Sequence, residues 1–264
     1  MFDAHCHLDD ERFADDLTAV LARARTAGVQ SFISAGYSPE RWRRQSTIAT
    51  QEEGVYVAYG IHPWHVSAHM DEPSSVMLAA LDACLSDDVY IKPVGIGEIG
   101  LDRSHYVEEA SYPLQVEVFR AQLALAREKD LPVVIHAVKT HADVLSFLKK
   151  DGVPKRGGQI HAFSASIEIA REYVKLGMSL SFGGAVTRPH AKRARTAAYE
   201  IPGEMLLCET DAPDMTPPGF PHRRNEPTSL PLVLQSIAEL REIPLEEAVA
   251  LTSQNTKHLF AIED

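Results

Sequence analysis

The sequence predicts a single-domain (β/α)8 barrel, the TIM barrel, and three observations support this prediction. Short apolar runs alternate with longer segments of helical periodicity, and this happens eight times along 264 residues. Such alternation indicates parallel strands joined by crossover helices, and eight units in this length favour a closed barrel. The alternative is an open doubly wound sheet, but no GxGxxG motif follows the first expected strand.

Eight short segments are expected to be strands. Several are apolar without interruption, such as residues 133–135 and 205–207, as strands covered on both faces should be. In chain order the expected strands are residues 2–5, 31–35, 55–60, 93–98, 133–136, 159–161, 178–182 and 206–209.

The segments between these strands repeat apolar residues at helical spacing. Residues 15–27 form an expected helix that stops at Gly28, a residue suited to end a helix. Residues 111–129, 166–175 and 229–240 are also expected helices, and a last one begins near Pro244 and runs towards His258. Because no linker or low-complexity tract interrupts the pattern, we expect residues 1–264 to form one domain.

Composition and charge narrow the classes of function. With 26 basic and 37 acidic residues, the formal net charge of −11 disfavours wrapping a long DNA duplex, although bound cations would permit a phosphate substrate. Cys6, Cys84 and Cys208 form no CxxC pair, so reduced thiols are expected. The acidic start does not resemble a signal peptide, and no stretch approaches the roughly 20 apolar residues that cross a bilayer. We therefore expect a cytoplasmic protein with no membrane association.

Histidines and acidic residues fall at the ends of five expected strands. In a barrel these ends converge on one mouth, where active sites lie. A buried cluster of imidazoles and carboxylates is costly unless protons or metal ions bind it, so metal binding is favoured over a structural polar network. Such ligands suit zinc or manganese, and room for water also allows magnesium. The set is His5, His7, Glu98, His136, His161 and Asp211.

Six motifs, in this order, resemble those of the TatD-type deoxyribonucleases, which belong to the amidohydrolase superfamily of metal-dependent barrels. They are DAHCHL at 3–8, GIHP at 60–63, GEIGLD at 97–102, PVVIH at 132–136, HAFS at 161–164 and ETDAP at 209–213. The resemblance runs from residue 1 to about 260 and includes RNxP at 224–227 and NTxxLF at 255–260. Each motif alone is weak, whereas their order and spacing are highly specific.

The resemblance implies two divalent metal ions, with zinc, magnesium and manganese as candidates. Paired ions polarise phosphate oxygens and lower the pKa of water, which allows phosphoester hydrolysis near neutral pH. Asp211 is expected to orient the attacking water and accept its proton, so Asp211 and Glu98 are the expected catalytic residues. By resemblance, His5, His7, Glu98 and Asp211 hold one ion, and Glu98 bridges to a second ion completed by His136 and His161.

Four further residues have expected roles around this centre. His62 is expected to hold a phosphate oxygen, with packing at a helix start as the alternative. Trp64 is expected either to stack on a nucleobase or to pack within its loop. Arg224 is expected either to bring positive charge to the mouth or to remain solvated. Glu209, two residues before Asp211, is expected to hydrogen-bond a ligand histidine.

The chain departs from the family pattern at two positions. Val138 stands two residues after His136, where the pattern has arginine, and the adjacent Lys139 is expected to point differently. Ala165 replaces a glycine, so a positive φ at that position would be less accessible. Both changes concern how the substrate phosphate is held and leave the expected metal ligands intact.

The other polar residues fit no ligand pattern. The basic run at residues 192–195 is expected to be the solvated face of a helix. The remaining histidines are expected at the surface or in packing roles, and include His69, His105, His141, His190, His222 and His258.

Three functions remain. The leading one is hydrolysis of phosphoester bonds at DNA ends or in oligonucleotides, because a net negative chain favours a terminus over a long duplex. The second keeps the barrel and the metals but cleaves an amide or carboxylic ester. The third, a non-catalytic binding scaffold, is disfavoured by the complete set of six ligands. Nothing in the sequence indicates an obligate protein partner.

Overall fold

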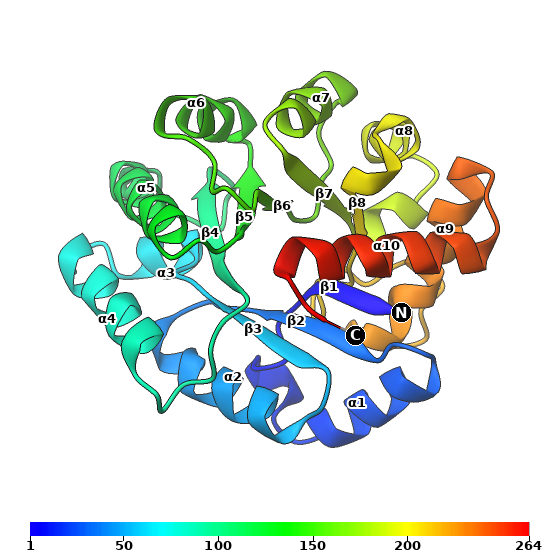
Figure 1. The fold of residues 1–264 in the computed structure, drawn as a ribbon, viewed down its shortest axis with the longest axis horizontal. Coiled ribbons are helices and arrows are strands. Elements are labelled where there is room, and N and C mark those ends of the chain that lie inside the picture. The colour runs from blue at the N-terminus through cyan, green and yellow to red at the C-terminus, as the bar shows by residue number, and fades with distance from the viewer. Residues whose placement is uncertain (264) are drawn as a thin grey trace.

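The computed structural model describes residues 1–263 as a nearly closed barrel of eight parallel strands surrounded by helices (Figure 1). Each strand pairs with the next one in the sequence, from β1–β2 to β7–β8. Beyond β8, the amide of Asp211 donates to the carbonyl of His5 at 2.9 Å, which joins the last unit to the first. The strands are β1 (Phe2–Cys6), β2 (Ser31–Ala35), β3 (Val55–Tyr59), β4 (Gly95–Asp102), β5 (Val133–Val138), β6 (Gly158–Ile160), β7 (Met178–Phe182) and β8 (Leu206–Cys208).

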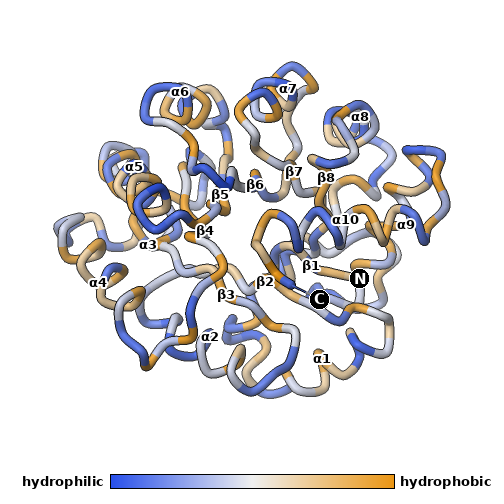
Figure 2. The backbone as a smooth tube through the Cα atoms, viewed as in Figure 1, coloured by the Kyte–Doolittle hydropathy of each residue, from blue (hydrophilic) through white to orange (hydrophobic). Residues whose placement is uncertain are grey.

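The helices form the outer layer, and Figure 2 shows hydrophilic and hydrophobic residues alternating along them. No helix within residues 1–263 is long and apolar enough to span a membrane. The α-helices are α1 (Leu17–Thr26), α2 (Pro39–Gln51), α3 (Pro63–Ala68), α4 (Ser74–Ser86), α5 (Tyr112–Glu128), α6 (His141–Asp151), α7 (Ile167–Lys175), α8 (Lys192–Glu200), α9 (Leu230–Arg241) and α10 (Leu245–Phe260). Short 3-10 helices are η1 (Glu11–Phe13), η2 (Glu109–Ser111), η3 (Gly184–Thr187), η4 (Gly203–Met205) and η5 (Pro227–Ser229).

The predicted barrel is confirmed, and all eight expected strands overlap observed ones. The largest difference is β4, which continues beyond Glu98 to Asp102. Five of the ten α-helices in the described chain, α2, α3, α4, α6 and α8, lie in segments for which no helix bounds were predicted. Helix α3 is only six residues long, which is too short for a clear apolar stripe.

The amino end of the barrel is sealed by the end of α10. Leu259 and Phe260 belong to a buried apolar cluster with Phe2 and Val134 in the barrel interior. In Figure 1, α10 lies across the ends of β1 and β8. Because this end is filled by apolar side chains, the polar strand ends can be reached only from the opposite, carboxyl side.

Gly100 allows β4 and β5 to approach closely beside the predicted site. Its φ is +150°, and a Cβ atom added there would lie 2.0 Å from the carbonyl oxygen of His136. Any other residue at this position would push the two strands apart. Glycine therefore maintains the strand spacing that brings Glu98 close to His136.

Candidate metal centre and active site

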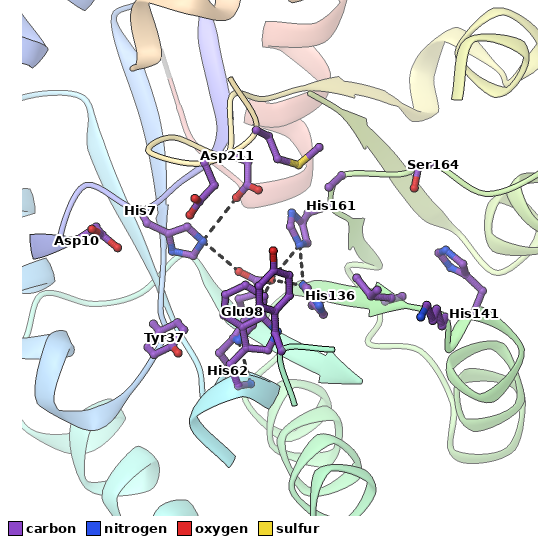
Figure 3. Close-up of a pocket in the computed structure, with 18 of the residues that line it drawn as sticks. His7, Asp10, Tyr37, His62, Glu98, His136, His141, His161, Ser164 and Asp211 are labelled. Atoms are coloured by element: carbon purple, nitrogen blue, oxygen red, sulfur yellow. Dashed lines mark hydrogen bonds and ion pairs between the residues drawn. The ribbon is translucent and has the colours of Figure 1, made fainter. Parts of the chain in front are cut away.

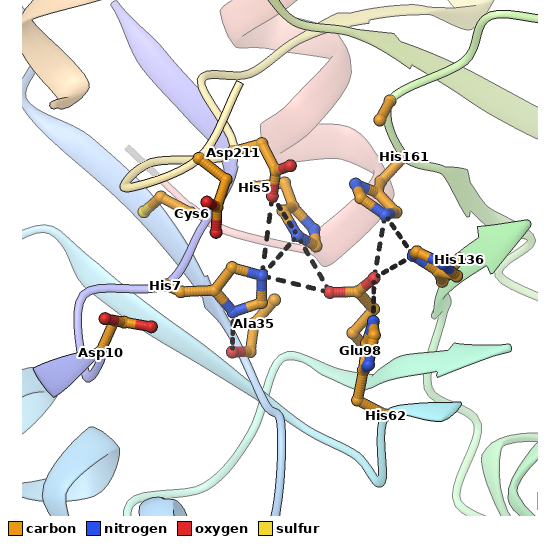
Figure 4. A network of polar contacts seen from close by, with 12 residues as sticks. His5, Cys6, His7, Asp10, Ala35, His62, Glu98, His136, His161 and Asp211 are labelled. Atoms are coloured by element: carbon orange, nitrogen blue, oxygen red, sulfur yellow. Dashed lines mark hydrogen bonds and ion pairs between the residues drawn. The ribbon is translucent and has the colours of Figure 1, made fainter. Parts of the chain in front are cut away.

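The six predicted ligands meet at the carboxyl end of the barrel (Figure 4). Five different strands or strand ends contribute them, as the sequence predicted. Five of the six are buried, and His7 is partly exposed. The convergence follows from the parallel barrel, in which every strand ends at the same face.

One group of donor atoms surrounds Oε2 of Glu98. The Nε2 atoms of His5 and His7 each lie 3.2 Å from this oxygen. Oδ1 of Asp211 lies 3.4 Å from Nε2 of His5 and 3.6 Å from Nε2 of His7. Two imidazoles and two carboxylate oxygens thus face one another across a space that suits a divalent cation.

A second group surrounds the other oxygen of the same carboxylate. Nδ1 of His136 and Nε2 of His161 each lie 2.9 Å from Oε1 of Glu98. The two nitrogens are 3.1 Å apart. Glu98 therefore presents one oxygen to each pair of histidines, which is the arrangement a bridging carboxylate requires.

Hydrogen bonds determine which ring nitrogen of two histidines carries the proton. Nδ1 of His7 lies 3.1 Å from the carbonyl oxygen of Ala35. A carbonyl oxygen can only accept, so Nδ1 is the donor and the lone pair of neutral His7 is on Nε2. By the same argument, Nε2 of His136 donates to Oδ2 of Asp102 at 2.8 Å and leaves the lone pair on Nδ1. Both lone pairs then face the carboxylate of Glu98.

The donor set fits bound metal ions. Oε2 of Glu98 is buried and accepts no hydrogen bond from residues 1–263, although two imidazole nitrogens lie 3.2 Å away. A buried carboxylate oxygen without a donor is costly, and coordination of a cation removes that cost. The histidine and carboxylate donors match the ligands that zinc and manganese take in proteins.

Asp102 is a site residue for which no role was predicted from the sequence. It ends β4, is buried, and accepts hydrogen bonds from His136 and, at 2.7 Å, from Nε1 of Trp64. Burial alone would raise the pKa of Asp102, but the hydrogen bond from His136 holds it below its ordinary value. The sequence spacing could have indicated that Asp102 belongs to the site, because residues four apart in a strand, such as Glu98 and Asp102, share a face.

His62 contacts Glu98 and also begins a helix. Its Nδ1 accepts from the backbone amide of Trp64 at 3.1 Å, as the N-cap of α3. Nε2 therefore carries the proton and donates to Oε1 of Glu98 at 3.1 Å. Burial lowers the pKa of His62 to about 4, so the ring is neutral at physiological pH. The helix-start role is thus present, and the phosphate contact stays a prediction.

The segment after β8 is held in place by two buried acids. Oε1 of Glu209 accepts from the amide of Ala162 at 2.6 Å and lies 3.5 Å from Nδ1 of His161. Asp3, for which no role was predicted, accepts from both the amide and the hydroxyl of Thr210. Glu209 thus lies beside a predicted ligand histidine, but Nδ1 of His161 forms no hydrogen bond within residues 1–263, so the expected hydrogen bond stays a prediction.

The ionisation of the two carboxylates facing the cavity is governed by the surrounding histidines. Burial opposes ionisation of Glu98, but the charges of His161 and His5 bring its pKa well below the ordinary value. Burial likewise opposes ionisation of Asp211, whereas its hydrogen bond with His5 and the charge of His161 lower its pKa. Both carboxylates are therefore ionised near neutral pH and available to a cation.

A cavity of about 760 Å³ opens over this centre (Figure 3). Its volume is typical of pockets that bind small ligands or a segment of a larger one. Tyr37, Trp64 and Tyr106 are its aromatic lining residues. The rings of Trp64 and Tyr106 are 4.9 Å apart, and Tyr106 is exposed. The cavity therefore combines a buried polar centre with an aromatic wall.

Arg224 does not line this cavity. Its guanidinium is bound by Asp16, at 2.8 and 2.7 Å, and by Glu226 at 2.9 Å, and it packs over the ring of Phe13. The geometry therefore gives no support to the expectation that Arg224 brings positive charge to the mouth. The basic residues that do line the cavity are Arg12, Arg41, Lys139 and Arg193.

Other expectations for the cavity wall also change. Ala165 is not among the residues with positive φ, so a glycine is not required there, whereas Ala162 has a φ of +45°. His141 lines the cavity, although it was expected at the surface or in packing. Its pKa is lowered to about 4 by burial, so it adds no charge to the wall.

The chain is similar to known proteins over its whole length. The family model described as TatD related DNase matches residues 2–261. The metal-dependent hydrolase YabD of Bacillus subtilis, whose activity is uncharacterised, is 38% identical over 99% of both chains. The 3'-5' ssDNA/RNA exonuclease TatD of Erwinia amylovora is 31% identical over 99% of this chain and 100% of its own. The crystal structure of YjjV, a TatD homolog from Escherichia coli, has a TM-score of 0.90 and 34% identity, and the match covers 100% of this chain and 98% of that one.

Proposed function

The chain belongs to the TatD-related DNase family of metal-dependent hydrolases, and we propose that it cleaves phosphodiester bonds at the ends of DNA or in oligonucleotides. One observation carries this proposal most strongly. Glu98 presents its two oxygens to two separate pairs of histidines, His5 with His7 and His136 with His161. This geometry supports two cations held side by side, as many phosphodiesterases use.

The proposed ligands follow from the two donor groups. Two divalent cations would supply positive charge to polarise the phosphate and to lower the pKa of water. Zinc, manganese and magnesium are the candidates. We assign His5, His7, Glu98 and Asp211 to one cation, and Glu98, His136 and His161 to the other.

The protein's own groups position and deprotonate the attacking water. Oδ1 of Asp211 faces the imidazoles of His5 and His7, and the carboxylate borders the cavity. An ionised carboxylate at this place can orient a water molecule and accept its proton. His62 and Asp102 hold Glu98 and His136 in orientation, and Glu209 supports the loop beside His161.

The shape and charge of the protein favour binding to the end of a DNA strand over binding to the middle of a DNA duplex. The net charge of −11 opposes long contact with a polyanion. The amino end of the barrel is sealed, so the cavity is a dead end rather than a channel. Trp64 borders the cavity and is proposed to stack against a terminal base. The relative from Erwinia amylovora, named as an exonuclease, agrees with this proposal.

The proposal is tested by metal-dependent product release. Protein treated with EDTA and then loaded with Zn²⁺, Mn²⁺ or Mg²⁺ is incubated with oligonucleotides labelled at the 5′ or the 3′ end. We expect nucleotides to be released only from metal-loaded protein, and the label identifies the attacked end. Parallel assays with an amide and a carboxylic ester test the alternative hydrolase function by relative kcat/KM. Equal inertness of loaded and chelated protein on every phosphodiester would overturn the proposal.

Substitution of Asp211 tests its assigned role. We expect Asp211→Asn to lower kcat on oligonucleotides by about 10²- to 10⁴-fold, because an amide cannot accept the proton. The matched control Asp15→Asn changes an exposed carboxylate outside the cavity and should leave kcat unchanged. Full activity in Asp211→Asn would remove Asp211 from the mechanism.

We also propose a reducing compartment such as the cytoplasm. All three cysteines are buried and unpaired, which agrees with a protein that forms no disulfides. Non-reducing peptide mapping of protein from its native cells tests this, and a disulfide involving any of the three would contradict it.

A further inference from the structure

Of the four basic residues that line the cavity, two are already neutralised. The guanidinium of Arg12 binds Oδ1 of Asp10 at 2.8 Å and Oδ2 of Asp214 at 2.7 Å. Nε of Arg41 binds Oδ2 of the buried Asp9 at 2.7 Å. A phosphate that recruited either arginine would leave carboxylates unpaired beside it. Among residues 1–263, this part of the rim, which follows β8, β1 and β2, therefore has no unpaired arginine or lysine lining the cavity.

The other two, Lys139 and Arg193, are free to bind an anion. Both are exposed and line the cavity, and no acidic side chain within residues 1–263 forms an ion pair with either of them. Lys139 directly follows β5, and Arg193 lies in the first turn of α8, after β7. Because β5, β6 and β7 are neighbours in the barrel, both residues lie on one arc of the rim. Ser164, in the loop after β6, adds an exposed hydroxyl to the cavity.

The backbone explains why Lys139 reaches the cavity. In a regular strand, consecutive side chains point to opposite faces, so Lys139 was expected to point differently from the position of Val138. The strand ends at Val138, and Lys139 has a φ of +59°, in the left-handed region. The alternation of strand side chains is broken there, and both residues line the cavity. Lys139 therefore borders the same cavity as Val138, although it was expected to point differently.

We propose that Lys139 and Arg193 bind the phosphate next to the scissile one, so that the preferred substrate carries at least two phosphodiester linkages. This inference rests on the proposed phosphodiesterase function. A free ammonium and a free guanidinium on the same arc form charge-assisted hydrogen bonds to a phosphate. On the part of the rim that follows β8 and β1, Asp10 and Asp214 place two carboxylates around Arg12 and would repel the same group. In this proposal the nucleic-acid substrate therefore extends from the metal centre over the loops after β5, β6 and β7.

Substrates that differ by one phosphate test the inference. The dinucleotide TpT has one linkage and the trinucleotide TpTpT has two. For the variant Lys139→Gln/Arg193→Gln we expect kcat/KM on TpTpT to fall about tenfold, and kcat/KM on TpT to stay within about twofold of the wild type. The matched control Lys192→Gln removes an exposed lysine next to Arg193 that does not line the cavity, and should match the wild type. Equal losses on both substrates, or no loss on either, would overturn the inference.

A substrate with one uncharged linkage identifies the phosphate that Lys139 and Arg193 bind. In TpTpT the linkage that is not cleaved is replaced by an uncharged methylphosphonate. The wild type should then lose about as much activity as the double variant loses on the natural substrate, and the double variant should lose little more. If the loss from the double variant and the loss from the methylphosphonate add up, Lys139 and Arg193 bind something other than this linkage.

Binding measurements separate this inference from the proposed activity. A fluorescent phosphorothioate (dT)8 keeps its charges and resists hydrolysis, so fluorescence anisotropy with Mn²⁺ reports affinity alone. We expect the double variant to bind about tenfold more weakly than the wild type and Lys192→Gln. The slope of log Kd against log salt should be smaller for the double variant by about 0.7 per phosphate that the wild type neutralises with these side chains. If the wild type cleaves nothing but this difference in affinity persists, the activity fails and the phosphate site stands. Identical affinities for all three proteins would refute the site.

Discussion

Asp102 determines which nitrogen of His136 faces the cavity. Its Oδ2 accepts the Nε2 proton at 2.8 Å, and Nδ1 is then left to face Glu98 at 2.9 Å. The same carboxylate holds the indole of Trp64 and so connects the metal centre with the aromatic wall. At the scale of single residues, the groups behind the donor atoms thus define the site as much as the donors themselves do.

Replacing Asp102 should weaken metal binding by an amount that depends on the new side chain. We expect Asp102→Ala to lower metal affinity by about 10- to 100-fold, because His136 loses the acceptor that orients it. Asp102→Asn should lose less, because its amide oxygen can still accept the Nε2 proton. Competition with a chromophoric chelator measures the affinities.

The control for this comparison is Asp88→Ala, which removes an exposed aspartate that does not line the cavity. It should bind metal as the wild type does. Equal affinities for Asp102→Ala and the wild type would show that Asp102 does not position His136.

At the scale of elements, an ion-pair network fixes the segment between β8 and α9 against α1. Glu226 accepts from Arg23 at 2.9 and 3.0 Å and from Arg224 at 2.9 Å, and Arg224 also binds Asp16. The Glu226 carboxylate is buried. The network therefore attaches η5 to α1. Asp211 lies on the same connecting segment, between β8 and η5.

Stability should depend on pH through Glu226. Burial alone would raise its pKa, but hydrogen bonds from Arg23 and Arg224 lower it in the folded state. A lowered folded pKa stabilises the protein above the unfolded value of about 4.3 and loses that contribution as pH falls below it. We expect Glu226→Gln to lower the free energy of unfolding at pH 7 by about 1–3 kcal/mol and to flatten its decline between pH 5 and 3.

Urea unfolding at a series of pH values measures this effect. The control Glu53→Gln changes an exposed carboxylate and should keep the wild-type pH profile. A profile of Glu226→Gln that runs parallel to that of the wild type below pH 5 would contradict the assignment.

At the scale of the whole molecule, one end of the barrel is apolar and the other is a ring of donors. Phe2 and Phe260 help to fill the amino end, whereas histidines and acids from five strands meet at the other. Without cations, the carboxylates of Glu98 and Asp211 lie together in a buried space. Bound cations should therefore stabilise the whole barrel as well as the site.

Removal of metal should lower the melting temperature. A ligand present at about 100 times its Kd stabilises the folded state by about 2.7 kcal/mol, which corresponds to roughly 5–10 °C for a chain of this size. Calorimetry of protein loaded with Zn²⁺ or Mn²⁺, and of the same protein in EDTA, measures the difference. The double variant His5→Ala/His7→Ala should lose most of this shift, and an unchanged shift would place the stabilising ion elsewhere.

The sequence by itself determined the barrel and the six polar residues that meet at its carboxyl end, because apolar periodicity and polar residues at strand ends are local patterns. Residues such as His5 and His7 needed only their spacing to be assigned to one face. The tertiary structure alone decided what depends on side chains from distant elements. It showed that Asp102 orients His136, that Arg224 is bound by Asp16 and Glu226, and that no acidic side chain of residues 1–263 pairs with Lys139 or Arg193. The physical reason is that the pairing of a charge depends on which side chains the fold brings within a few ångströms of it, and no spacing along the chain specifies that.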